Sequence, residues 1–252
     1  PDYDQLRPNF TFNDANQTIS GGNPDAQPER AYGVDAYYEW YIQPQGFFSA
    51  GLFYKRVEDV LFGDSRVFNS NVLNTAGVDR SQYRLSTLVN GGDGYIWGFE
   101  GALQLQLDPY VEQLDLPEWM GGFGINVNVT ANESQATTPG GTRVTLPGTS
   151  DVVYNLAGYY EKYGLSARLN YRKRTAWLDS YGPASDGGNT YWAADDELDA
   201  SIRYAVTDNL EVYVDGSNLL DNPGRRYVRE SQYTIEWERF GRRIDAGIRF
   251  SF

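Results

Sequence analysis

The stretch YIWGFEGALQLQLD (residues 95–108) decides the fold class of this chain. Apart from Gly101, every second position from Tyr95 to Leu107 is aromatic or aliphatic, and mostly polar or small side chains lie between them. Successive side chains of a β-strand point to opposite faces of the sheet. The stretch therefore predicts a strand with one apolar face and one mostly polar face.

The same period of two recurs before and after this stretch. FGINVNVTAN (residues 123–132) repeats it most cleanly. About nine segments show the pattern in all: 32–43, 48–55, 95–108, 123–132, 154–160, 165–174, 198–206, 210–214 and 243–252. The longer segments reach the ~9–11 residues with which a tilted strand spans a bilayer.

The connections between these segments alternate in length. Short turns occur at 44–46, 163–164 and 207–209, on the same side as a somewhat longer link at 108–120. Long polar connections occur near 60–93, 134–150, 178–191 and 220–239. Short periplasmic turns and long extracellular loops are typical of outer-membrane barrels.

These patterns predict an all-β fold, a transmembrane antiparallel up-and-down β-barrel. The 252 residues contain no apolar run near the ~20 residues of a membrane-spanning helix. Their 20 Tyr, 12 Phe and 6 Trp are the side chains that form aromatic girdles at membrane interfaces. The alternative is a soluble β-sandwich, whose strands also alternate.

The composition excludes several kinds of chemistry. With no Cys and no His, the chain has no thiolate or imidazole for zinc, no thiol nucleophile and no Ser-His-Asp triad. A formal charge of -13 argues against nucleic acid, which requires a basic face. We therefore predict that the chain is not an enzyme and binds no nucleic acid, metal or cofactor.

Five short motifs appear in order along the chain. They are GNPDAQPE (22–29), FYKRVED (53–59), GFE (98–100), YYE (159–161) and SNLLDN (217–222). Together with Gly241, Arg242 and the terminal Phe252, they make the chain resemble the C-terminal barrel of TonB-dependent outer-membrane receptors, although Ala26 stands where that family usually has Leu. Their order is most similar to the branch associated with uptake of carbohydrate or other nutrients.

The resemblance implies a 22-stranded barrel in the bacterial outer membrane. Residues 1–252 would form the C-terminal portion of one β-barrel domain, with about nine or ten of its strands. The plug domain, the TonB box and the earlier strands are absent from this sequence. The chain begins at Pro1 without a leader pattern, and an open sheet edge is not viable in hydrocarbon, so we expect either a fragment or a second chain that completes the barrel.

The implied function is active import of a scarce nutrient, such as a carbohydrate or siderophore, across the outer membrane. The implied partners are the lipid bilayer, a small-molecule substrate, and TonB with ExbB and ExbD acting through a plug domain. The barrel-assembly machinery would capture the strand that ends at Phe252, by strand addition. Two alternatives are a passive porin-type barrel and a soluble carbohydrate-binding β-sandwich module.

An aromatic cluster flanks one long loop and is the candidate substrate site. Its members are Trp177, Tyr181, Tyr191 and Trp192, with Asp186 and Asn189 beside them. Flat ring faces next to carboxylate and amide groups would stack on and hydrogen-bond a sugar ring. An outer aromatic girdle would also place Trp and Tyr at this height without any ligand.

Two charged groups are further candidates. One group is the arginines of a single strand, Arg168, Arg172 and Arg174, which lie opposite its apolar positions. They are predicted to point into the lumen. There they would attract an anion, contact the plug or pair with acids such as Glu100 and Glu161. Residues 195–199 carry four carboxylates that suggest a calcium or glycosidase site. These carboxylates lack the glycine spacing of a calcium loop, so a solvated strand end is favoured.

Overall fold

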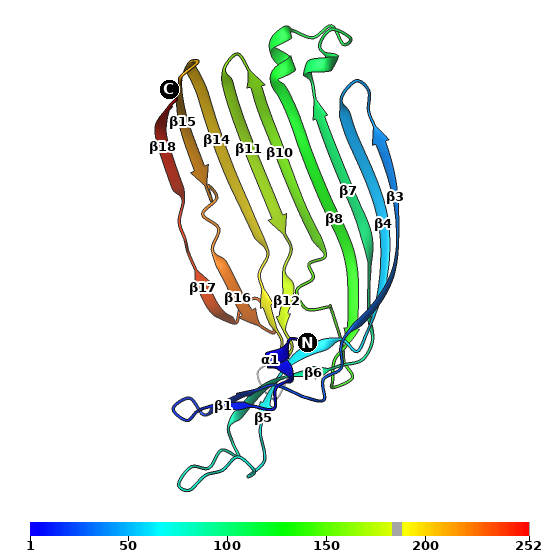
Figure 1. The fold of residues 1–252 in the computed structure, drawn as a ribbon, viewed down its shortest axis with the longest axis vertical. Helices are drawn as coiled ribbons and strands as arrows, with labels where there is room; N and C mark the ends of the chain where they lie inside the picture. Colours follow the sequence, from blue (N-terminus) through cyan, green and yellow to red (C-terminus); the bar gives the residue numbers. More distant parts are fainter. Residues whose placement is uncertain (183–187, 252) are drawn as a thin grey trace.

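The computed structural model describes residues 1–182 and 188–251, and one long antiparallel sheet dominates it (Figure 1). We call this sheet the wall sheet. Its long strands lie in the order β3 (Arg30–Tyr41), β4 (Gly46–Glu58), β7 (Gly94–Gln106), β8 (Phe123–Thr137), β10 (Val152–Lys162), β11 (Leu165–Arg174), β14 (Asp195–Thr207), β15 (Leu210–Ser217) and β18 (Arg243–Phe250). The short β9 (Arg143–Val144) pairs with the end of β8. The nine predicted segments are confirmed as these nine long strands.

The register explains why the period of two persists across the sheet. One row of paired residues runs across five strands as Leu103, Val127, Leu156, Tyr171 and Leu198. The adjacent row, on the opposite face, runs as Gln104, Asn126, Ala157, Asn170 and Asp199. A register shift of one residue in any strand would exchange its two faces. Because apolar residues pair with apolar residues across these five strands, the sheet has one apolar face and one polar face.

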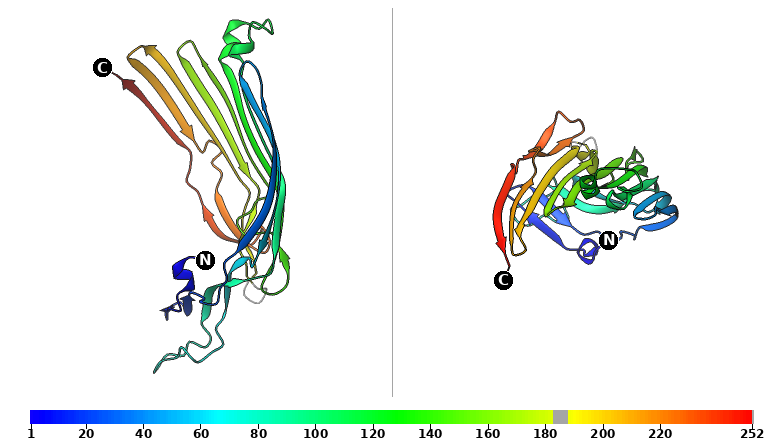
Figure 2. Two further views of the ribbon diagram at one scale, coloured as in Figure 1. Left: turned by 45° about the vertical axis from the view of Figure 1, so that its right-hand side comes forward. Right: turned by 90° about the horizontal axis from the view of Figure 1, so that it is seen from above.

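The wall sheet is curved but not closed within the described residues. The strand order ends at β3 and β18, which do not pair with each other, and Figure 2 shows an arc when the sheet is viewed from above. The middle of the apolar face is uncovered: Leu52 in the middle of β4 is 63% exposed. At the short-turn end, Trp119 of the 3₁₀ helix η2 (Glu118–Gly122) contacts Phe123 on this face, with ring centroids 6.0 Å apart. A soluble β-sandwich would cover this face with a second sheet. The structure instead has the form of part of a barrel wall.

The two ends of the wall sheet differ as predicted. At one end the hairpin turns are short, and the longer link between β7 and β8 contains the 3₁₀ helices η1 (Asp108–Tyr110) and η2 (Glu118–Gly122). At the other end lie the long connections and the N-terminal segment with helix α1 (Tyr3–Leu6) (Figure 1). No helix in the part of the chain that the structure describes is long and apolar enough to span a membrane.

The N-terminal segment and three of the long connections contain two small sheets that the period of two did not predict. The N-terminal loop sheet consists of β1 (Phe10–Asn13), β2 (Thr18–Gly21), β6 (Arg84–Asn90) and β5 (Leu61–Val67), with β2 and β6 parallel. The C-terminal loop sheet consists of β12 (Trp177–Ser180), β13 (Thr190–Trp192), β16 (Gly224–Val228) and β17 (Thr234–Glu238). Apart from the β5–β6 hairpin, each pair of these strands has five or fewer paired residues. Segments this short contain too few alternating positions to be predicted as strands from sequence.

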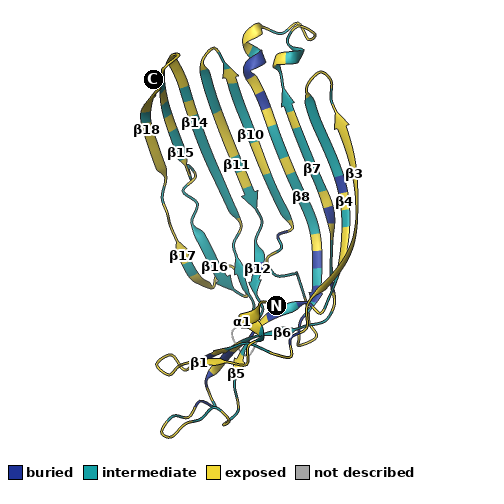
Figure 3. Cartoon of the chain, viewed as in Figure 1, coloured by how far each residue is buried: buried dark blue, intermediate teal, exposed yellow. Residues whose placement is uncertain are grey.

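The buried hydrophobic side chains lie at the loop end. The buried positions that Figure 3 marks along the wall strands include the glycines Gly51, Gly98 and Gly124, which contribute no side chain to a core. The buried hydrophobic residues among those described are Ile19, Ala26, Val60, Phe62, Tyr83, Leu85, Ala136 and Leu178. None lies in the middle of a wall strand. The wall sheet therefore has no core of its own and depends on a different environment at each of its two faces.

Candidate functional site

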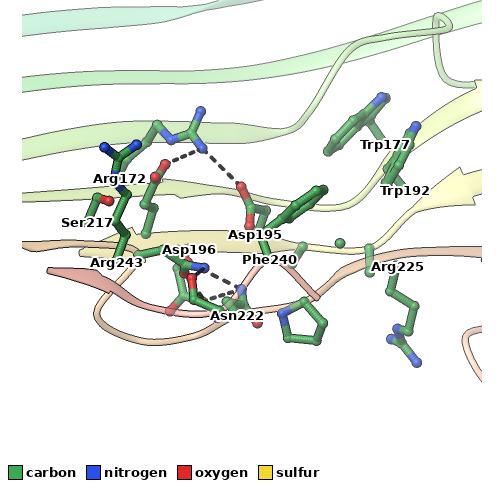
Figure 4. A pocket seen from close by; sticks show the side chains of 17 residues that line it. Arg172, Trp177, Trp192, Asp195, Asp196, Ser217, Asn222, Arg225, Phe240 and Arg243 are labelled. Atoms are coloured by element: carbon green, nitrogen blue, oxygen red, sulfur yellow. Dashed lines mark hydrogen bonds and ion pairs between the residues drawn. The ribbon is translucent and has the colours of Figure 1, made fainter. Parts of the chain in front are cut away.

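A cavity of about 580 Å³ lies where the wall sheet meets the C-terminal loop sheet (Figure 4). Its lining comes from the ends of β11, β14 and β15, from β12 and β13, and from the turns before β16 and β18. Loops carried on a rigid sheet are where binding residues are commonly found. We take this cavity as the candidate site.

An ion-pair cluster forms the wall-sheet side of the cavity. The register places Arg172 opposite Glu197, and the guanidinium Nη2 lies 2.8 Å from Glu197 Oε2 and 3.2 Å from Asp195 Oδ2. All three side chains remain partly exposed, so the pairs contribute little stability. The charge of Arg172 is nevertheless already compensated by two carboxylates.

Two stacked tryptophans form the loop-sheet side of the cavity. Trp177 and Trp192 are directly paired across β12 and β13, with ring centroids 6.0 Å apart and planes 19° from parallel (Figure 4). The guanidinium carbon of Arg174 lies 3.6 Å from the Trp177 centroid, and that of Arg226 lies 5.4 Å from the Trp192 centroid. Because guanidinium groups lie over both rings, the tryptophans offer a ligand chiefly their edges.

Arg226 is held by carboxylates from two other strands of the loop sheet. It donates to Glu236 Oε2 at 2.8 Å on β17 and forms an ion pair with Asp179 on β12. The hydrogen bond to Glu236 is the largest cause of a raised pKa at Arg226, with Asp179 adding to it. The arginine therefore stays charged and fixes the position of the Trp192 ring.

The SNLLDN motif (217–222) forms the turn after β15, and three of its residues line the cavity beside the end of β14. Asp199 Oδ1 accepts from the backbone N–H of Asn218 at 2.9 Å, and Asn218 Nδ2 donates to the carbonyl of Gly241 at 2.9 Å. Asn222 Nδ2 donates to Asp196 Oδ1 at 2.7 Å. Two asparagine amides thus join β14, the turn and the segment before β18.

A charge pair on the same turn adds a further contact. Asp221 and Arg239 form an ion pair, with Arg239 Nε 3.1 Å from Asp221 Oδ2. The hydrogen bond from Arg239 holds the pKa of the Asp221 carboxyl below its usual range. Asp221 has φ 55°, in the left-handed region that Asn and Asp tolerate better than most residues. The motif residues therefore have a structural role in shaping the turn.

The structure brings together only part of the predicted aromatic cluster. Trp177 and Trp192 line the cavity, whereas Tyr191 stacks on Tyr227 with centroids 5.4 Å apart and does not line it. Tyr181 packs instead against the hydrophobic cluster around Phe62, with centroids 5.7 Å apart. The four aromatic side chains therefore do not gather around one cavity, because the tyrosines stack on other rings. That the cluster binds a substrate stays a prediction.

The remaining predicted residues have different surroundings. Asn189 accepts from the backbone N–H of Gly182 and donates to the hydroxyl of Tyr191, so it holds its own loop. Asp186 and the terminal Phe252 lie outside the described residues.

The three arginines of β11 share the polar face of the wall sheet, but their partners differ from the predicted ones. Arg172 pairs with acids of β14, and Arg174 Nε donates to Ser150 Oγ at 2.6 Å. Arg168 lies over the Tyr159 ring at 5.3 Å. Glu100, proposed as a partner, accepts from the Tyr37 hydroxyl. Among the described residues, the acids that pair with Arg172 are Asp195 and Glu197 of the neighbouring strand β14.

Several lining residues were not predicted as part of a site. Phe240 is 78% exposed and borders the cavity, together with Arg243, Ser217, Asn218 and Asn222. The four carboxylates at 195–199 were interpreted as a solvated strand end, yet Asp195, Asp196 and Glu197 also line the cavity. The SNLLDN motif was the available signal, because it marks the turn that carries three of these residues.

The lining suits an organic molecule with both apolar and hydrogen-bonding parts. Phe240 and the tryptophan edges offer apolar contact, whereas Ser217 and the asparagines offer neutral polar groups. The charged groups already contact one another, as the Arg172 cluster shows. Within residues 1–182 and 188–251, no group of three or more acidic side chains is arranged to hold a metal ion.

Comparison with known proteins identifies the family. The model of the family described as "TonB dependent receptor-like, beta-barrel" matches residues 1–219. A search of curated protein sequences found no significant match.

Solved structures similar to this chain are receptors and transporters. The ferric-catecholate import receptor Fiu from K12 E. coli has 16% identity and a TM-score of 0.60, over 90% of this chain and 28% of that one. The ferric enterobactin receptor PfeA of Pseudomonas aeruginosa, as a mutant bound to enterobactin, has 14% identity and a TM-score of 0.61, over 100% and 37%. The copper transporter OprC has 16% identity and a TM-score of 0.60, over 92% and 33%.

The three solved structures match this chain over a similar share of their length and with similar TM-scores. The chain spans about a third of the length of each solved structure, and at this identity the likeness shows a common fold. Receptors of this kind are outer-membrane proteins. With the family model matching most of its residues, the chain belongs to the TonB-dependent receptor-like β-barrel family.

Proposed function

We propose that this chain forms part of the barrel wall and extracellular loops of a receptor that imports a scarce nutrient across the bacterial outer membrane. Energy would come from TonB, with ExbB and ExbD, acting through a plug domain. The observation that carries the proposal is the cavity between the wall sheet and the C-terminal loop sheet, at the loop end of a family barrel.

The position of the cavity supports this role. It is reached from the polar face of the wall sheet, where Arg172 and Arg243 lie, and it is bordered by the exposed ring of Phe240. A ligand captured by the loops would meet these groups before it reached the rest of the polar face. The nutrient would be a carbohydrate, a siderophore or a similar molecule.

The mixed lining favours binding through shape and neutral hydrogen bonds. Arg172 is already paired with Asp195 and Glu197, so a ligand gains little from its charge. Specificity would then come from polar groups such as Ser217 and from apolar contact with Phe240.

Uptake by the full-length protein in cells with and without TonB tests the proposal. Cells would be given radiolabelled oligosaccharides and ferric siderophores, and we expect saturable uptake of one class that disappears without TonB. Uptake that is unsaturable and independent of TonB would indicate the passive porin-type barrel instead. No uptake of either class in both strains would contradict import of these nutrients.

A matched pair of variants connects the uptake to the cavity. Phe240→Ala removes an exposed ring that borders the cavity, so folding should be unchanged while the half-saturation concentration rises. Trp237→Ala removes a ring that is 61% exposed on the same connection but does not line the cavity. Equal effects of the two variants would show that the cavity is not the binding site.

A further inference from the structure

A second hollow lies on the apolar face of the wall sheet, far from the cavity described above. Two rows of paired residues cross β8, β10, β11 and β14 at this point. One row reads Ile125, Gly158, Leu169, Ala200, and the other reads Phe123, Tyr160, Ala167, Ile202. Because small residues alternate with large ones, the surface is hollowed, with a cavity volume of about 420 Å³.

Gly158, Ala167 and Ala200 form the floor of this hollow, which we call the apolar notch. A Cβ atom built on Gly158 would meet no heavy atom within 4 Å. The exposed lining is mostly apolar, although Tyr159, Arg168 and Ser201 of the same strands also border it. The rings of Phe123 and Tyr160 support each other edge to face, with centroids 5.0 Å apart. The notch is therefore a fixed hollow between strands and not a gap left by a mobile side chain.

The notch is open to the surroundings of the barrel. Leu169 at its centre is 50% exposed, and the wall residues Phe123, Ile125 and Ile202 are exposed as well. The notch is continuous with the apolar face that a family barrel presents to lipid. It lies toward the end with short turns, since Tyr160 is three residues from the turn at 163–164.

We propose that the apolar notch binds one acyl chain of a glycerophospholipid from the periplasmic leaflet. Short turns mark the periplasmic end of outer-membrane barrels, so this leaflet is the one that reaches the notch. An unfilled hollow would lose dispersion contacts along its lining, and a flexible chain restores them. A lining whose exposed surface is mostly apolar matches hydrocarbon.

Photo-crosslinking of the full-length protein tests this proposal. The protein would be reconstituted into vesicles of phosphatidylethanolamine and phosphatidylglycerol, with a small fraction of phosphatidylethanolamine carrying a diazirine in its acyl chain. After irradiation, crosslinked peptides are mapped by mass spectrometry. We expect crosslinks concentrated on residues 158–169 and 200–202 compared with the rest of the apolar face.

Filling the notch should remove these crosslinks. Gly158→Leu places a side chain in the open space, and most crosslinks at the notch should be lost. Ala36→Leu adds a comparable side chain on the same face of β3, away from the notch, and should leave them unchanged. If Gly158→Leu fails to insert into membranes, Ala167→Leu fills the same floor from β11.

Two results would overturn the proposal. Crosslinks spread evenly over the apolar face, or unchanged by the filling variants, would show ordinary contact with fluid lipid. A doubled mass in detergent together with absence of lipid crosslinks at the notch would show that a second copy of the protein occupies it.

Discussion

The wall sheet and the two loop sheets are stabilised in different ways. In the wall, Leu52 and Leu169 are exposed although they lie in the middle of strands, and no described sheet covers the apolar face. In the loop sheets, Phe62 and Leu178 are completely buried. The wall therefore relies on lipid at one face, whereas the loops have cores of their own, as a soluble protein does.

The loop cores join segments that are distant in sequence. Val60, Phe62 and Ala136 form a cluster against which Tyr181 packs. Val60 and Phe62 come from the connection after β4, Ala136 from the loop end of β8, and Tyr181 from the segment after β12. A second cluster contains Ile19, Tyr83 and Leu85. The difference between the regions predicts that substitutions in the wall respond to which face they occupy, and that substitutions in the loops respond to individual contacts.

The largest expected effect compares two adjacent residues of β11. Leu169→Arg places a charge on the apolar face in the half of the strand nearer the short turns, where the cost lies between ~0–1 kcal/mol at the interface and ~2–4 kcal/mol at the bilayer midplane. Asn170→Arg places the same charge on the polar face, directly opposite Asp199, and should change stability little. Denaturant unfolding of the full-length protein in lipid vesicles measures both. Similar losses for the two variants would contradict the assignment of the faces.

A smaller, local effect is expected for Arg80 in the N-terminal loop sheet. Arg80 is 8% exposed. Its Nε and Nη2 donate to the two carboxylate oxygens of Asp14, at 2.9 and 3.0 Å. Its Nη1 donates to the carbonyl of Leu73 at 3.0 Å. Arg80→Ala leaves these acceptors unpaired, so amide exchange in residues 68–83 should become roughly tenfold faster. Exchange in the wall sheet should not change.

The exposed pair of Arg7 and Asp4 provides the control for this variant. Their side chains are largely in solvent, so Arg7→Ala should leave exchange in residues 68–83 unaltered. If Arg80→Ala also accelerated exchange throughout β3 and β4, the loop sheet and the wall would be one cooperative unit and the distinction between them would fail.

The sequence predicted the wall well because each strand repeats the same simple signal. Along β8, the alternation from Phe123 to Asn132 marks both faces without reference to any other strand. Nothing comparable exists for the loop sheets. The pairing of Trp177 with Trp192 depends on two three- or four-residue strands whose register no local pattern specifies.

The candidate site was predicted only in part for the same reason. Composition and position pointed to Trp177, Trp192 and Arg172. Which ring faces remain free depends on Arg174 and Arg226, and the second of these is separated from Trp192 by 34 residues of sequence. Tertiary pairing, and not residue type, decides what each side chain offers to a ligand.

The smallest expected effect is a pH dependence confined to the N-terminal loop sheet. The hydrogen bond from Arg80 holds the pKa of the Asp14 carboxyl below its ordinary value. A lowered pKa in the folded state means that the contribution is fully present above pH ~4 and is lost as the pH falls through the lower value. Amide protection in residues 68–83, corrected for intrinsic exchange rates, should therefore decrease below pH ~4.

Asp14→Asn isolates the contribution of this carboxyl from that of Asp79 in the same loop. The pKa of Asp79 is also lowered, chiefly by the backbone N–H of Ser81, so some pH dependence remains in the variant. Protection in Asp14→Asn should start lower at neutral pH and decrease less on acidification than in the unmodified protein. Parallel pH curves for the two proteins would show that the Asp14–Arg80 contact does not stabilise the loop, and that the packing around Ile19 and Tyr83 holds it alone.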